Sequence, residues 1–64
     1  MVDNRAYLDE QYKIAMLDYK TAHTEQEQWD ARMRMAKLER TAMELYGFNF
    51  SDQMHDKYIN KKNL

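Results

Sequence analysis

Gly47 is the only strong helix breaker in this 64-residue chain, because the sequence has no other glycine and no proline. The residues before Gly47 are rich in alanine, leucine, methionine, glutamate, glutamine, lysine and arginine, which form helices readily. The strict alternation of apolar and polar residues that marks a half-buried strand is missing. We therefore predict an all-α protein, and the open question is where its helices begin and end.

Two apolar stripes run along residues 3–46 in steps of three and four, which is heptad spacing. The first stripe consists of Leu8, Tyr12, Ala15, Tyr19, Ala22, Gln26, Trp29, Met33, Ala36, Arg40 and Met43. The second stripe consists of Tyr7, Glu10, Ile14, Leu17, Thr21, Thr24, Gln28, Ala31, Met35, Leu38, Ala42 and Leu45. Because neither stripe slips out of register, a single coiled-coil rod is one interpretation of this segment.

Both stripes lose their apolar character between residues 21 and 28, where most stripe positions are polar. Thr24 followed by Glu27 has the form of a capping box, in which two side chains satisfy free amides at the start of a helix. A turn near His23 would bring the two apolar segments together and bury far more apolar surface than a rod. We therefore predict a helical hairpin, with the continuous rod as the alternative. The predicted helices cover residues 3–22 and 25–46.

Gly47 predicts the end of the second helix. We expect it to be the left-handed residue of a Schellman-type stop, in which Phe48 touches Met43. Such a stop leaves the chain free to start a new helix in another direction.

A short third helix is predicted over residues 52–60, with Asn49 or Ser51 as its N-cap. Three large apolar side chains of this region fall four residues apart on one helical face: Phe50, Met54 and Tyr58. This face would pack on the hairpin.

We expect residues 1–64 to form one small domain that self-associates. A chain of this length buries only about 60% of the surface that it exposes when unfolded. Such a core rarely supplies more than roughly 3–5 kcal/mol of stability. Cysteine is absent, so disulfides cannot add to this stability. We predict a homodimer or higher oligomer that completes a bundle, because a compact hairpin would leave part of the second stripe uncovered. The predicted seam consists of Leu17, Met35, Leu38 and Leu45.

The net charge of −1 offers no strong field for nucleic acid. Residues 1–32 carry four basic and seven acidic groups, a net of −3, and residues 33–64 carry six and four, a net of +2. This asymmetry suits antiparallel or head-to-tail pairing. No apolar run approaches the ~20 residues that span a bilayer, and the acidic N-terminal segment does not resemble a secretory signal. We expect a cytoplasmic protein with no membrane partner.

The chain carries no motif that indicates catalysis. His23 lies four residues before Glu27, and His55 lies near Asp52 and Asp56. On a helix these spacings could place two ligands near one another, but a metal site needs three or four, so we expect both histidines to be solvent-exposed at helix ends. With one glycine there is no phosphate-binding loop, and the hydroxyl side chains lack a nucleophile signature. We therefore predict that the protein is not an enzyme and has no metal or cofactor.

Four basic residues fall within nine positions of the second predicted helix: Arg32, Arg34, Lys37 and Arg40. On a dimer such a stripe could bind phosphates. Acidic residues at i,i+4 spacing, in the pairs Asp30–Arg34 and Arg40–Glu44, favour an ordinary solvated face. A small nucleic-acid-binding dimer is therefore the alternative and not the leading hypothesis.

The eight aromatic and six methionine residues exceed what one small core can hide. Tyr, Trp and Met are enriched at protein interfaces, and methionine adapts to irregular partner surfaces. The leading hypothesis is a non-enzymatic module that binds and modulates a larger protein. The predicted anchors are Trp29, Met33, Tyr46, Phe48 and Phe50. Two alternatives stay open: Phe48 and Phe50 could cover the open end of the hairpin, and the chain could be a structural subunit of a larger assembly, such as that of a phage.

Overall fold

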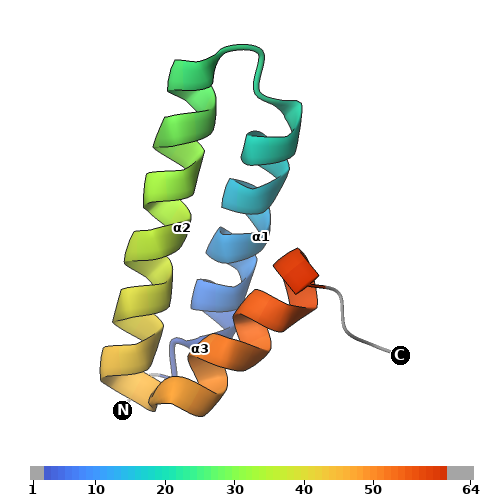
Figure 1. The fold of residues 1–64 in the computed structure, drawn as a ribbon. Helices are drawn as coiled ribbons and strands as arrows, with labels where there is room; N and C mark the ends of the chain where they lie inside the picture. Colours follow the sequence, from blue (N-terminus) through green and yellow to red (C-terminus); the bar gives the residue numbers. More distant parts are fainter. Residues whose placement is uncertain (1–2, 61–64) are drawn as a thin grey trace.

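Two antiparallel helices and a third that folds back across them make up the computed structural model, which describes residues 3–60 (Figure 1). The long helices are α1 (Arg5–Thr21) and α2 (Glu25–Tyr46), and the short one is α3 (Phe48–His55), which continues into a π-helical turn, η1 (Asp56–Asn60). These residues form no β-strand. The predicted all-α hairpin with a short C-terminal helix is confirmed, and the rod is wrong. None of these helices has the length and apolar character needed to cross a bilayer.

The turn between α1 and α2 lies where both apolar stripes become polar. Ala22 leaves the helical conformation, with φ −63° and ψ 141°. The Glu27 amide donates to Thr24 Oγ1 at 3.1 Å, which is the predicted N-cap bond. The Glu27 carboxylate accepts from the amide of His23 at 2.8 Å. The predicted capping box therefore forms, except that the Glu27 side chain binds the amide of His23, one residue before the cap, rather than the amide of Thr24. Together the two bonds hold the chain on both sides of Thr24.

Gly47 ends α2, but not in the predicted way. Its φ is positive at 93°, as a left-handed residue requires, yet its ψ of 173° is extended. A Schellman-type stop needs a helical ψ, so that prediction is wrong. Phe48, which was expected to return to Met43, is 70% exposed. The Gly47 conformation instead redirects the chain straight into α3 without linker residues.

The start of α3 also differs from the prediction. The helix begins at Phe48 rather than near residue 52, and neither Asn49 nor Ser51 caps it. Ser51 is buried within α3, and its hydroxyl donates to the backbone carbonyl of Glu39 at 3.3 Å. The earlier start is favoured because it turns Ser51 and Met54 together towards the hairpin.

The core lies where the three helices meet. Seven buried side chains form it: Leu8, Tyr12, Ala15, Met16, Met35, Ala42 and Met54. Five partly buried side chains pack against them: Tyr19, Leu38, Tyr46, Phe50 and Tyr58. The shared face predicted for Phe50, Met54 and Tyr58 is therefore confirmed. The core includes two alanines, Ala15 and Ala42, and its largest fully buried side chains are Tyr12 and Met54.

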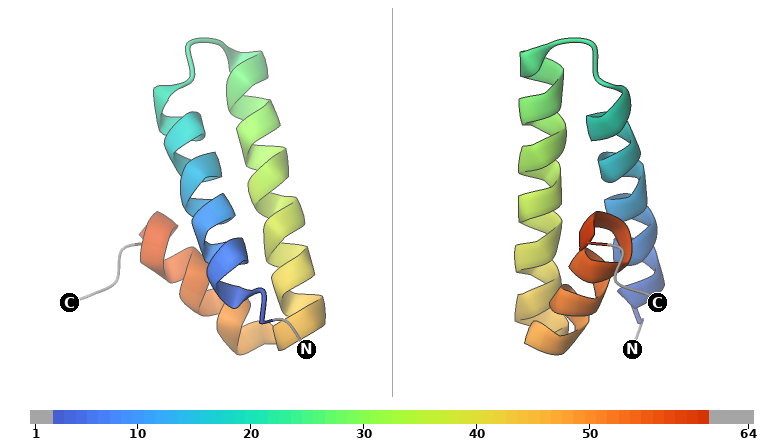
Figure 2. Two further views of the ribbon diagram at one scale, coloured as in Figure 1. Left: turned by 180° about the vertical axis from the view of Figure 1, so that it is seen from behind. Right: turned by 45° about the vertical axis from the view of Figure 1, so that its right-hand side comes forward.

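The helix α3 covers only one face of the hairpin. Figure 1 shows α3 crossing in front of α1 near the open end, and the view from behind shows α1 and α2 with α3 beyond them (Figure 2). The molecule is a slab with extents of 38 × 29 × 15 Å. One broad face of this slab therefore consists of α1 and α2 alone.

Candidate functional site

The outer side of α2 carries a stripe of exposed side chains that faces away from the core. Trp29 is 58% exposed and Met33 is 50% exposed. At about 100° per residue, Met33 lies half a turn around the helix from the buried Ala42. Ala36 and Arg40 continue the line at steps of three and four and are also exposed. We call these four residues, Trp29, Met33, Ala36 and Arg40, the outer stripe.

Cations flank the outer stripe. Arg32 and Lys37 are exposed on either side of it, and Arg40 contacts Glu44 only loosely, at 3.7 Å with both side chains mostly exposed. An exposed pair of this kind contributes little. A shallow hollow of about 450 Å³ over Met33 and Ala36 is bordered by Arg34, Lys37 and Arg40. The stripe therefore offers an apolar floor with a basic rim.

Arg34, the fourth residue of the predicted basic cluster, borders this hollow and is paired with the other long helix. Its guanidinium pairs with the Asp18 carboxylate of α1 at 2.7 Å. The predicted i,i+4 partner, Asp30, instead accepts from Gln26 Nε2 at 3.0 Å. All four cations therefore lie near the outer stripe, and Arg34 also links the two long helices.

Two of the predicted anchors, Tyr46 and Phe50, pack inside the chain. Their rings meet edge to face with centroids 5.5 Å apart, and both lie against the core. The Tyr46 hydroxyl accepts from the Asn4 amide at 2.7 Å, and the Arg5 guanidinium lies 5.5 Å from the Tyr46 ring centroid. This corner ties the start of α1 to the end of α2. The position of Phe50 suits the alternative role of closing the open end of the hairpin.

Phe48 is the remaining predicted anchor and the most exposed of the five. It lies at the start of α3, beyond the end of α2, whereas Trp29 lies near the start of α2. The five predicted anchors therefore do not form one patch: Trp29 and Met33 share the outer stripe, and Phe48 lies apart.

The residues of the predicted seam also separate. Met35 is buried in the core of one chain and Leu38 is partly buried against it. The expectation that the hairpin leaves Met35 uncovered is wrong, because that side chain points between α1 and α2. Leu17 and Leu45 are exposed, as expected. Self-association itself stays a prediction.

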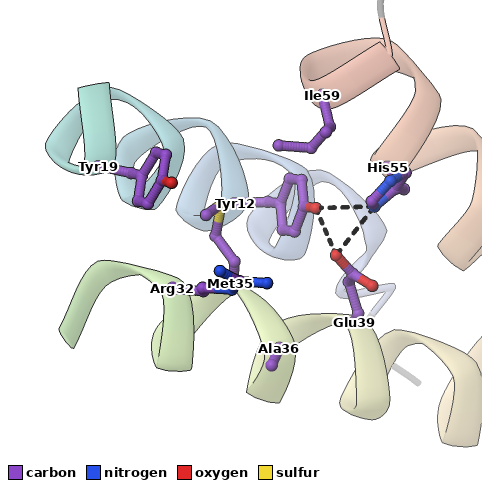
Figure 3. A pocket seen from close by; sticks show the side chains of 8 residues that line it. All are labelled: Tyr12, Tyr19, Arg32, Met35, Ala36, Glu39, His55 and Ile59. Carbon is purple, nitrogen blue, oxygen red and sulfur yellow. Dashed lines mark hydrogen bonds and ion pairs between the residues drawn. The ribbon is translucent and has the colours of Figure 1, made fainter. Parts of the chain in front are cut away.

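A cluster of three polar side chains joins the three helices beside the core, and sequence analysis did not predict it (Figure 3). The Tyr12 hydroxyl donates to Glu39 Oε2 at 2.5 Å. His55 Nδ1 lies 3.2 Å from the same carboxylate oxygen and 3.4 Å from the Tyr12 hydroxyl. His55 lies at the end of α3, as expected, but its side chain is only partly exposed because it takes part in this contact. The only sequence signal was its place directly after Met54 on the buried face of α3.

Burial raises the pKa of Tyr12 above its ordinary value, and the hydrogen bond to Glu39 and the negative charge of that carboxylate raise it further. The hydroxyl therefore keeps its proton and acts as a donor. A tyrosine held in this state does not supply a phenolate nucleophile. The geometry suits a structural link between α1, α2 and α3.

The cluster closes one end of an open pocket of about 380 Å³. In Figure 3 the side chains of Tyr12, Glu39 and His55 converge at one end, and Tyr19 lies towards the other. The complete lining is Tyr12, Tyr19, Arg32, Met35, Ala36, Glu39, His55 and Ile59. Within residues 3–60, no three His, Cys, Asp or Glu side chains gather as a metal site would need.

No protein-family model, curated protein or solved structure matches the chain.

Proposed function

We propose that this protein is a non-enzymatic interaction module that binds a larger protein through the outer stripe of α2. The observation that carries the proposal is the exposure of Trp29 and Met33 on the side of α2 that faces away from the core. Tryptophan is among the residues most enriched in binding hot spots, where truncation often costs 2 kcal/mol or more. Neither side chain belongs to the buried core or to the side chains packed against it.

The basic rim indicates what the partner offers. Arg34, Lys37 and Arg40 border the hollow over Met33 and Ala36, and Arg32 is exposed on the other side of the stripe. Complementary potentials steer association and exclude wrong partners. We therefore propose that the partner presents an apolar surface bordered by Asp and Glu side chains, and that its binding weakens as salt is added.

Affinity capture from the native host, followed by measurement with the purified partner, tests this function. We expect Trp29→Ala and Met33→Ala each to weaken binding by roughly tenfold or more, the equivalent of about 1.4 kcal/mol. Phe48→Ala is the matched control, because it removes an exposed aromatic residue away from the stripe. Circular dichroism should show all three variants folded. Unchanged binding by the Trp29 and Met33 variants would contradict the proposal.

The same cations beside an exposed indole could also bind single-stranded nucleic acid, where bases stack on aromatic rings and Lys and Arg neutralise phosphates. Nuclease treatment during the capture separates the two functions. A ligand that is lost on nuclease treatment and on Lys37→Glu would replace our proposal with the nucleic-acid alternative.

A further inference from the structure

The open pocket beside the polar cluster has two polar layers of different character. Tyr12 on α1 and Glu39 on α2 belong to the first layer, where the tyrosine hydroxyl donates to the carboxylate. The two helices are antiparallel, so seven residues further along α1 and seven residues back along α2 reach the same level of the hairpin, two helical turns or about 10 Å away. The residues at those two positions are Tyr19 and Arg32, and both line the pocket.

The second layer consists of two hydrogen-bond donors. In Figure 3, Tyr19 and Arg32 lie on facing helices, to the same side of the polar cluster. Neither the Tyr19 hydroxyl nor the Arg32 guanidinium forms a hydrogen bond or an ion pair with another residue in the range 3–60. A guanidinium binds a carboxylate through charge-assisted hydrogen bonds, and a carboxylate has lone pairs enough to accept from a hydroxyl as well. The chemistry of this layer therefore suits a carboxylate.

The rest of the pocket sets the shape of the molecule that carries this carboxylate. Apart from His55, the remaining lining residues are apolar: Met35, Ala36 and Ile59. The pocket volume of about 380 Å³ lies within the roughly 300–1,000 Å³ of small-molecule sites. The negative charge of Glu39 disfavours an anion at the first layer, so the charged group belongs at Arg32 and an apolar body belongs between the two layers.

We propose that this pocket binds a small organic carboxylic acid with an apolar body. The carboxylate accepts from Arg32 and Tyr19, and the body lies along Met35 and Ile59 towards the polar cluster. The pocket is open, so part of the ligand stays in water and the affinity is modest. This site does not depend on the proposed function, because it needs no larger partner.

Titration of the purified, isotope-labelled protein with cinnamate, followed by NMR, tests the proposal. Cinnamate carries one carboxylate on a flat apolar body. We expect its addition to shift the backbone amide signals of Arg32, Ala36 and Ile59 in a saturable way. Cinnamamide has the same shape without the charge, and it should bind roughly tenfold more weakly, because the charge-assisted bonds to Arg32 are lost.

Two substitutions separate this site from general attraction to a basic helix. Arg32→Gln should weaken cinnamate binding by roughly tenfold, and Tyr19→Phe by roughly threefold, because the first removes a charge and the second removes one hydrogen bond. Arg40→Gln is the matched control, since it removes another exposed arginine of α2 that does not line the pocket. It should leave binding unchanged. Circular dichroism should show all three variants folded.

The absence of any saturable shift at millimolar cinnamate overturns the proposal. So does equal binding of cinnamamide, or unchanged binding by either Arg32→Gln or Tyr19→Phe. An equal loss for Arg40→Gln would show that the acid follows the charge of α2 as a whole. Shifts centred on Met33 and Lys37 would place the acid on the outer stripe, which also contradicts the proposal.

Discussion

The hydroxyl of Tyr12 on α1 donates a 2.5 Å hydrogen bond to the carboxylate of Glu39 on α2. Tyr12 is fully buried, while Glu39 stays in contact with solvent at the edge of the pocket. His55 joins the same carboxylate oxygen from α3. One acidic side chain therefore links all three helices at the edge of the core.

Replacing Tyr12 by phenylalanine should lower the free energy of unfolding by about 1–2 kcal/mol, since the ring is kept and a hydrogen bond to a charged group is lost. The urea midpoint should fall while the slope of unfolding stays the same. Tyr7→Phe is the control, because it removes an exposed hydroxyl outside the cluster. Equal midpoints for the two variants would show that the bond contributes nothing.

The same hydrogen bond should make stability depend on alkaline pH. Burial, followed by the bond to Glu39, raises the pKa of Tyr12 above 10.0, the value expected in the unfolded chain. The unfolded state therefore loses a proton above pH 10 that the folded state keeps. The contribution of Tyr12 is complete below pH 10, and it falls by at most about 1.4 kcal/mol per pH unit above it.

Urea unfolding from about pH 9 to about pH 11 measures this effect. We expect a steeper loss of stability for the wild type than for Tyr12→Phe, because the variant lacks the titrating group. Parallel curves for the two proteins would mean that Tyr12 ionises alike in the folded and unfolded states, contrary to the prediction.

Local signals predicted most of the fold. The start of α2 at Glu25 could be read from the sequence because Thr24 and Glu27 act within one helical turn. The end of α2 could be read from Gly47, since no other residue there accepts a positive φ easily. The start of α3 could not be predicted in this way. It depends on how Ser51 fits against Glu39, twelve residues away, and no local rule contains that contact.

The candidate sites show the same limit. Trp29 and Met33 were predicted to lie at a binding surface because the chain has more aromatic and methionine side chains than one small core can bury. Arg34 was assigned to Asp30 by spacing, yet it reaches Asp18 on the other helix, sixteen residues earlier. The polar cluster was missed for the same reason, because its three members come from three helices and each looks ordinary within its own segment.

Gly47→Ala should lower the free energy of unfolding by about 1–3 kcal/mol, because φ 93° with ψ 173° is a region that only glycine adopts without strain. An added Cβ would meet nothing within 4 Å, so the cost comes from the backbone alone. Gly47→Asn distinguishes this conformation from a left-handed helical one, because of these two conformations asparagine is tolerated only in the left-handed helical one. We expect Asn to cost as much as Ala in thermal melts. A mild effect of Asn would favour the Schellman-type stop instead.

Thr24→Ala should cost about 1 kcal/mol, because the free amide of Glu27 loses the oxygen that caps it. Thr21→Ala is the matched control: the hydroxyl of Thr21 donates to the Leu17 carbonyl within α1, a bond that adds little to a helix. Thermal melting of both variants gives the comparison. The prediction fails if Thr21→Ala is the more damaging change.

Trp29 is the only tryptophan, so its fluorescence reports on the outer stripe alone. We expect acrylamide to quench it efficiently in the free protein, because the side chain is more than half exposed. The extent of quenching therefore measures how accessible the outer stripe is to solvent. It should fall when the larger partner is added, because the indole is then buried in the interface. Unchanged quenching at a partner concentration that saturates binding would contradict a place for Trp29 in the interface.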